Sequence, residues 1–213
     1  MHSYVMVKSE GTGGKSFAID VFSKLVEERV IFLHEEIDAN IASNIIATLL
    51  YLDQQDSKKE ITIYINSDGG DIEALFAIYD TFQIIAAPIK TVAIGKAYSA
   101  AAVLLAAGTK GMRYICPNAQ AMIHHIQVSE MEGSKREVVE QVARLDSENR
   151  ALVEILARHC GQTASQVDED CQEDKYFNAK EAVKYGLADK IMPMRKKQPP
   201  LKRATTRRRR KSK

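Results

Sequence analysis

The stretch Gly95-Lys96-Ala97-Tyr98-Ser99-Ala100-Ala101-Ala102 joins an apolar run to an alanine-rich segment. The run before it, residues 89–94, predicts a buried strand that ends at Gly95, and the alanines predict the start of a helix. A serine at a strand-to-helix turn can be exposed as a nucleophile, with backbone N–H groups nearby to receive an oxyanion. Ser99 is therefore a candidate nucleophile. The alternative is a small residue where a helix packs closely.

A second short apolar stretch, Ala121-Met122-Ile123-His124-His125, follows in the chain. It predicts a strand that delivers histidines, and His124 is a candidate base for Ser99 because serine needs an adjacent base to become nucleophilic. A histidine after two apolar residues is equally compatible with a buried structural side chain. These two stretches alone leave both interpretations open.

Units of strand, turn and helix repeat through the middle of the chain. Residues 61–65 alternate as a strand that ends at Asn66-Ser67-Asp68-Gly69-Gly70, before a helix predicted over residues 71–85. Glycine permits positive φ and close approach, so an N–H of this turn can point into a site; the alternative is a plain tight turn. The alternation predicts an α/β fold with parallel strands, whose ligand sites lie beyond the carboxyl ends of the strands. Gly69-Gly70 and Ser99 are therefore expected to lie close together. The glycine spacing excludes a dinucleotide loop or P-loop.

The remaining periodicity predicts further helices and strands. Helices are expected over residues 17–28, 38–52, 98–107, 134–160, 163–170 and 178–186, and strands over 29–33, 113–116, 120–125 and 187–192. Ser134 and Glu137 form a capping box, and Gly161 ends the long helix. At 1.5 Å per residue this helix is about 40 Å long, so it is expected to project from the body and to meet another subunit.

Composition divides the chain of 213 residues into three parts: a flexible N-terminal segment (1–15), a globular body (16–194) and a disordered basic tail (195–213). The tail has eleven Lys and Arg and no acid, whereas the 19 basic and 28 acidic residues of the rest give it a charge of −9. The tail is either a solvated segment or a contact for nucleic acid or another acidic partner.

No run reaches the ~18 apolar residues of a membrane span, and residues 1–15 contain no apolar core of a signal peptide. Three cysteines without metal or redox spacing suit a reducing compartment, so the cytoplasm is the expected location.

Five blocks carry a resemblance over residues 16–192. They are Tyr64-Ile-Asn-Ser-Asp-Gly-Gly70, Gly95-Lys-Ala-Tyr-Ser99, Ala106-Ala-Gly-Thr-Lys-Gly111, Met122-Ile-His124 and Glu181-Ala-Val-Lys-Tyr-Gly-Leu187. In order and spacing they resemble the proteolytic subunit of the Clp protease (ClpP).

The resemblance implies a crotonase-type α/β fold with a long projecting helix, the handle, here within residues 126–160. It also implies a serine endopeptidase that degrades unfolded proteins inside a chamber of heptameric rings stacked as a tetradecamer. An AAA+ unfoldase of the ClpX, ClpA or ClpC kind would use the ATP, and this chain would need no metal or cofactor.

The resemblance also assigns residues. The nucleophile falls on Ser99, the base on His124 rather than His125, and the acid on Asp174, which the residues alone do not separate from Asp168, Asp170 or Glu173. The oxyanion donors would be the N–H groups of Gly70 and Ala100. The apolar positions at which the ATPase docks would include Tyr64, Val92, Ile94 and Tyr114.

Some positions depart from the family pattern. Asp68 stands where the family has proline, Tyr98 replaces a small residue, and Ala100 replaces a methionine. The segment after the base, residues 125–133, has one glycine where the family has proline and several glycines. These departures favour, as the alternative, a weakly active or inactive structural subunit of a mixed ring.

Overall fold

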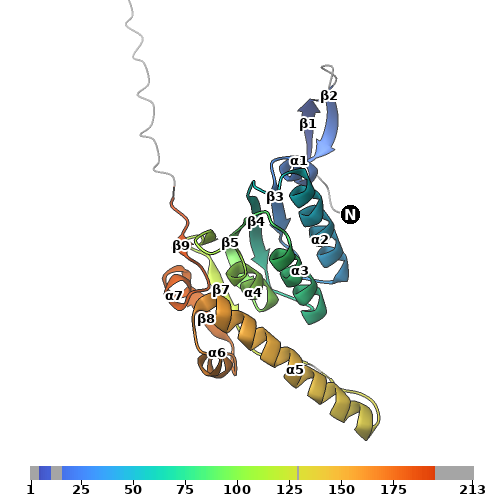
Figure 1. Ribbon diagram of the computed structural model, residues 1–213, viewed down its shortest axis with the longest axis vertical. Helices are drawn as coiled ribbons and strands as arrows, with labels where there is room; N and C mark the ends of the chain where they lie inside the picture. The colour runs from blue at the N-terminus through green and yellow to red at the C-terminus, as the bar shows by residue number, and fades with distance from the viewer. Residues whose placement is uncertain (1–4, 11–15, 129, 195–213) are drawn as a thin grey trace, which may run out of the picture.

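The computed structural model describes residues 5–10, 16–128 and 130–194, and Figure 1 shows their arrangement. The strands are β1 (Met6–Glu10), β2 (Ser16–Asp20), β3 (Val30–Leu33), β4 (Ile61–Ser67), β5 (Ile89–Tyr98), β6 (Arg113–Ile115), β7 (Gln120–Ile123), β8 (Lys175–Asn178) and β9 (Lys190–Ile191). The helices are α1 (Val21–Glu27), α2 (Ala39–Gln55), α3 (Ile72–Ile84), α4 (Ala100–Ala106), α5 (Lys135–Cys160), α6 (Ala164–Asp170) and α7 (Ala179–Tyr185). The predicted basic tail lies outside the described residues.

One sheet organises the body, and its strands are parallel except β8. Its main order is β3-β4-β5-β6-β9, while β7 pairs with the second half of β5 and β8 pairs antiparallel with β7. The helices α2, α3 and α4 follow strands β3, β4 and β5 as the alternating pattern predicts. The central strands are buried, as the isoleucines of β4 illustrate: Ile61, Ile63 and Ile65 have almost no exposed surface. The predicted α/β fold with parallel pairing is confirmed.

Strand β5 continues through Gly95 to Tyr98, although the sequence predicted that this strand would end at Gly95. At Gly95 the strand changes its pairing partner: residues 91–93 pair with β6, whereas residues 96–98 pair with β7. Gly95 has a φ of +77°, which lets the strand bend without breaking. The extension carries β5 directly to Ser99 and places β7 beside it.

The N-terminal prediction was wrong in two respects. Residues 17–20, assigned to the helix predicted over residues 17–28, belong to β2, and residues 6–10 of the predicted flexible segment form β1, which pairs antiparallel with β2. Phe17 and Ile19 fit a strand period as well as a helical one. Asp20 then decides where the helix begins, because its carboxylate accepts a hydrogen bond from Ser23 N and caps α1.

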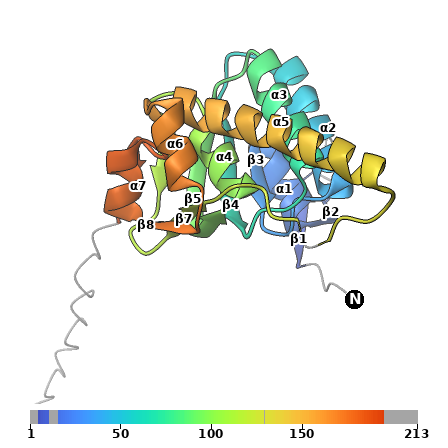
Figure 2. The ribbon, with the colours of Figure 1, turned by 90° about the horizontal axis from the view of Figure 1, so that it is seen from below.

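The long helix α5 begins and ends where its caps predict. Ser134 and Glu137 form the capping box, and Gly161 takes the left-handed conformation after the last turn. Figures 1 and 2 show α5 passing α4 and projecting beyond the rest of the body. No helix within residues 5–10, 16–128 and 130–194 is long and apolar enough to cross a bilayer.

A buried ion pair joins the far edge of the sheet to the end of α5. The Arg113 guanidinium, 1% exposed, donates to both carboxylate oxygens of Asp189 and to the carbonyls of Ala106 and His159. Burial alone would raise the pKa of Asp189, but the hydrogen bonds from Arg113 and Gly111 outweigh it and lower that pKa to about 2.

We predict that Asp189→Asn lowers the free energy of unfolding by about 3 kcal/mol, because it leaves the Arg113 charge buried and unpaired. The matched control, Glu60→Gln, loses only an exposed pair with Lys90 and should change stability by less than about 1 kcal/mol. Urea unfolding followed by circular dichroism measures both. Folding lowers the pKa of Asp189, so the stabilisation by the Asp189–Arg113 pair is complete above about pH 4 and is lost as the pH falls towards 2. Equal losses in the two variants would contradict the assignment.

Candidate active site

Ser99 occupies a strained turn between β5 and α4. Its φ of 53° and ψ of −124° make it one of two non-glycine residues with positive φ among those described. Such backbone strain costs on the order of 1–3 kcal/mol and persists only where the surroundings impose it. Ser99 N donates to Met122 O on β7 at 2.8 Å, and every residue of α4 is buried. The turn is therefore fixed from both sides, with the serine side chain left at its outer edge.

The Gly69-Gly70 turn closes against Ser99, as the sheet geometry predicts. A β-carbon added to Gly69, at φ +104°, would lie 2.8 Å from Ser99 Cβ. Gly70 lies against Ile37, whose N–H donates to Gly69 O and whose carbonyl accepts from Asp71 N. Only glycine fits this approach of three backbone segments.

His124 follows β7 and reaches the serine. Its Nε2 lies 2.8 Å from Ser99 Oγ, the distance of a good hydrogen bond, and its side chain is only 14% exposed. The other ring nitrogen, Nδ1, lies 3.2 Å from Oδ1 of Asp174. These two atoms are in contact, but they are not aligned as a hydrogen bond, so Nδ1 is buried without one. Catalytic contacts are often loose before substrate binds.

The structure separates the acids that the residues alone left open. Asp168 pairs with His125 at 3.1 Å, and Asp170 pairs with Lys175. Asp174 is the acid that contacts His124. The arrangement Ser99–His124–Asp174 therefore has the order of contacts that a serine nucleophile, its base and an orienting acid require.

The remaining part of the site is a cleft of about 350 Å³ above Ser99. Its lining combines polar and apolar side chains: Asp68, Gly70, Asp71, Ile72, Leu75, Ser99, Ala100, Met122, His124, Ile126, Gln127 and Leu152. The N–H groups of Gly70 and Ala100 both border this cleft, and neither donates to a backbone or side-chain acceptor within the described part of the chain. Two free amides beside a nucleophile can stabilise a developing oxyanion.

The predicted docking residues form a row across the sheet. Tyr64, Val92 and Tyr114 are directly paired on β4, β5 and β6, and Ile94 follows on the same strand as Val92. Val92, the middle residue of this row, is fully buried, whereas Ile94 is exposed. The Tyr64 ring stacks on Phe32, and Lys90 lies over Tyr114.

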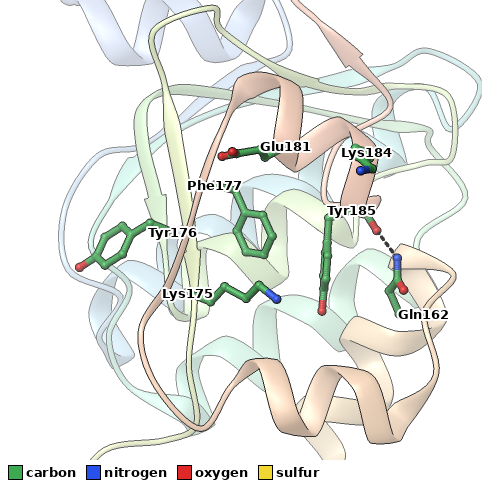
Figure 3. A pocket seen from close by; sticks show the side chains of 7 residues that line it. All are labelled: Gln162, Lys175, Tyr176, Phe177, Glu181, Lys184 and Tyr185. Atoms are coloured by element: carbon green, nitrogen blue, oxygen red, sulfur yellow. Dashed lines mark hydrogen bonds between the residues drawn. The ribbon is translucent and has the colours of Figure 1, made fainter.

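A pocket of about 410 Å³ lies on the other side of β8, and Figure 3 shows its lining. Lys175 extends beneath Phe177 towards the Tyr185 ring, and its ammonium pairs with Asp170. Burial raises the pKa of Tyr185, which keeps its hydroxyl protonated. This pocket contains no nucleophile with an adjacent base, so we assign the chemistry to the cleft above Ser99.

Comparison with known proteins shows the family to which the chain belongs. The profile of the family described as Clp protease matches residues 13–195. The chain belongs to the Clp protease family. A curated relative, the "ATP-dependent Clp protease proteolytic subunit 1" of Corynebacterium glutamicum, is 42% identical over 175 residues, which cover 82% of this chain and 84% of that protein. The chain is accordingly a serine protease of the Clp type, with the α/β fold expected of that family.

The structure adds two side chains that the sequence analysis of this Clp protease missed. Gln127 Nε2 and Tyr176 Oη each contact the carboxylate of Asp174. For Tyr176 a signal was available, because i and i+2 share one face of an extended segment. For Gln127 none was, because residues 124–128 form an irregular loop.

We predict that Gly69→Ala lowers peptide turnover at least about 100-fold, because the new methyl group displaces Ser99 from its position beside the N–H groups of Gly70 and Ala100. Gly111→Ala is the matched control: it has a similar φ of +87° but open space around the added carbon. It should cost about 1 kcal/mol in stability and leave turnover intact. Steady-state hydrolysis of a short fluorogenic peptide compares the two, and equal activities would refute the close approach.

Proposed function

We propose that this chain is the peptide-cutting subunit of an ATP-dependent protease, with Ser99 as nucleophile, His124 as base and Asp174 as orienting acid. The observation that carries the proposal is the 2.8 Å contact of Ser99 Oγ with His124 Nε2 at a strained strand-to-helix turn. A serine held in this way is activated by its neighbour rather than by its own acidity.

In the proposed reaction Ser99 Oγ attacks a peptide carbonyl while His124 takes its proton. His124 then returns the proton to the leaving amine, and water repeats the sequence to release the acyl group. Asp174 fixes the imidazole tautomer and stabilises the imidazolium. The N–H groups of Gly70 and Ala100 hold the oxyanion, each contributing roughly 3 kcal/mol to the transition state. No step calls for a metal ion.

We extend the proposal to assembly and to a partner. The name of the relative describes an ATP-dependent protease and a subunit of it, which supports delivery of substrates by a separate ATPase. Helix α5 carries exposed Val139 and Val142 on its projecting part, which suits contact with another copy in a ring. Tyr64, Ile94 and Tyr114 are the proposed contacts for an unfoldase. Heptameric rings, their stacking and the cytoplasmic location are parts of this proposal; the three cysteines are unbridged, which suits a reducing compartment.

One observation favours a second candidate, a weakly active structural subunit of a mixed ring. Nδ1 of His124 is not aligned with Asp174, and His124 lies in an irregular segment, residues 124–128. Such a chain would form rings but would depend on a partner subunit for its activity.

We predict that Ser99→Ala lowers peptide turnover by about 10⁴–10⁶-fold, because the triad acts as a unit. A fluorophosphonate should add once, at Ser99, to a ring-sized species in intact and native mass spectra. An adduct at another residue would exclude Ser99 as nucleophile. Rings without any adduct would favour the structural subunit.

The two adjacent histidines should differ sharply. We predict a loss of about 10³-fold or more for His124→Ala and less than about tenfold for His125→Ala, because only His124 contacts Ser99. His125 donates its backbone N–H to Cys171 O and pairs through its ring with Asp168, so its replacement removes a surface contact. Peptide hydrolysis by both variants tests the assignment, which the reverse ranking would overturn.

A further inference from the structure

Asp174 is an unusual orienting acid because so much of it faces solvent. Its side chain is 42% exposed, compared with 14% for His124. It lies immediately before β8, after the turn that ends α6. A carboxylate in this position can turn towards water, whereas an orienting acid must keep a fixed place beside the imidazole. Some other contact is therefore required to hold it.

Two side chains supply such contacts from different segments. Gln127 Nε2, from the loop after β7, donates to Asp174 Oδ1 at 3.4 Å. Tyr176 Oη, from β8, donates to Asp174 Oδ2 at 3.4 Å. With His124 at 3.2 Å, three side chains surround the two carboxylate oxygens. A carboxylate has about four acceptor positions, so the three donors do not exclude one another.

Tyr176 is itself held from the side of the nucleophile. Its ring meets the ring of Tyr98 edge-on, with centroids 5.6 Å apart. Tyr98 immediately precedes Ser99, and its hydroxyl donates to Gln120 Oε1 at 3.0 Å. Tyr98, Met122 and Tyr176 are paired in one row across β5, β7 and β8. The nucleophile turn and the orienting acid are thus connected through two aromatic rings.

The other side of β8 fixes the strand that carries this contact. Figure 3 shows Tyr176 pointing away from Lys175, Phe177 and Tyr185. Lys175 pairs with Asp170 and lies over the rings of Phe177 and Tyr185. The residue next to Asp174 is therefore anchored on one face, which leaves Tyr176 to act on the other.

We propose that Gln127 and Tyr176 are positioning residues that hold Asp174 against His124, and that Tyr98 braces Tyr176. This proposal rests on the proposed function, because it concerns the acid of the same triad. The desolvation of Tyr176 and the charge of Asp174 raise the pKa of the phenol. Tyr176 therefore remains protonated near neutral pH and donates to the carboxylate.

The test is a double-mutant cycle on the full-length protein, read by the rate of fluorophosphonate labelling and by the kcat and KM of a short peptide. Tyr176→Phe and Gln127→Leu should each lower kcat and the labelling rate about threefold to tenfold, with KM unchanged, because long hydrogen bonds to a charged group are lost. In an Asp174→Ala background neither substitution should have a further effect. Tyr51→Phe, which removes an exposed hydroxyl from α2, is the matched control and should leave both rates unchanged.

Tyr98 provides a second measurement that does not need Asp174→Ala. Tyr98→Ala should lower kcat about as much as Tyr176→Phe, and Tyr98→Phe, which keeps the ring, should recover most of that loss. A rise in KM instead would make Tyr98 a wall of the substrate cleft and overturn its bracing role.

Losses that persist in the Asp174→Ala background, or full activity of the Tyr176→Phe/Gln127→Leu double variant, would overturn the positioning of Asp174. Ser99→Ala, measured alongside, keeps the two proposals apart, because its activity tests the proposed function alone.

Discussion

The strained backbone of Ser99 is the constraint on which the rest of the site depends. A residue with φ of 53° is stable only if its neighbours leave it no alternative, and here three elements do so. Met122 O accepts its N–H, Gly69 lies close enough to exclude any side chain, and a fully buried α4 follows. The same contacts that impose the strain also bring His124 and the N–H groups of Gly70 and Ala100 close to the serine. The backbone strain at Ser99 and the pre-organisation of the site therefore have the same structural cause. The packed core around α4 offsets the free-energy cost of that strain.

The change of partner along β5 explains how residues far apart in the sequence meet. If β5 had ended at Gly95, Ser99 would have followed a loop, and β7 would have lost its pairing with β5 and kept only its pairing with β8. Because Gly95 bends the strand instead, residues 96–98 recruit β7, and β7 in turn recruits β8. One strand then ends just before Ser99, the next just before His124, and the third begins just after Asp174. Hydrogen bonding between strands sets the spacing of the three side chains more rigidly than loops would.

The sequence was informative where a local interaction determines the structure. Ser134 with Glu137 marked the start of α5 correctly, because a capping box involves only four residues. The sequence was misleading at Phe17 and Ile19, whose spacing fits both a strand and a helix, and it did not indicate β8, whose pairing with β7 is a long-range contact.

The acid that contacts His124 is the clearest case of a long-range contact. Asp168, Asp170 and Asp174 are chemically equivalent in the sequence, and only the positions of His125, Lys175 and His124 distinguish them. The family resemblance points to Asp174, the acid that contacts His124, because a resemblance over the whole body carries such long-range information.

The contacts of the exposed Asp174 depend on the projecting part of α5. The fully buried residues of α5 all lie between Leu152 and Cys160, so no side chain of the part before Leu152 is fully buried. Its capping box and the Arg136–Glu140 pair contribute at most a few tenths to about 1 kcal/mol each, which is little for a helix with exposed valines. His124 is followed by residues 125–128, which form an irregular segment that leads towards α5 and contains Gln127. A surface that covered the exposed part of α5 would restrain the loop, and with it one of the contacts of Asp174. The position of Asp174 beside His124 is for this reason more sensitive to what lies against α5 than the position of Ser99, which the buried core already fixes.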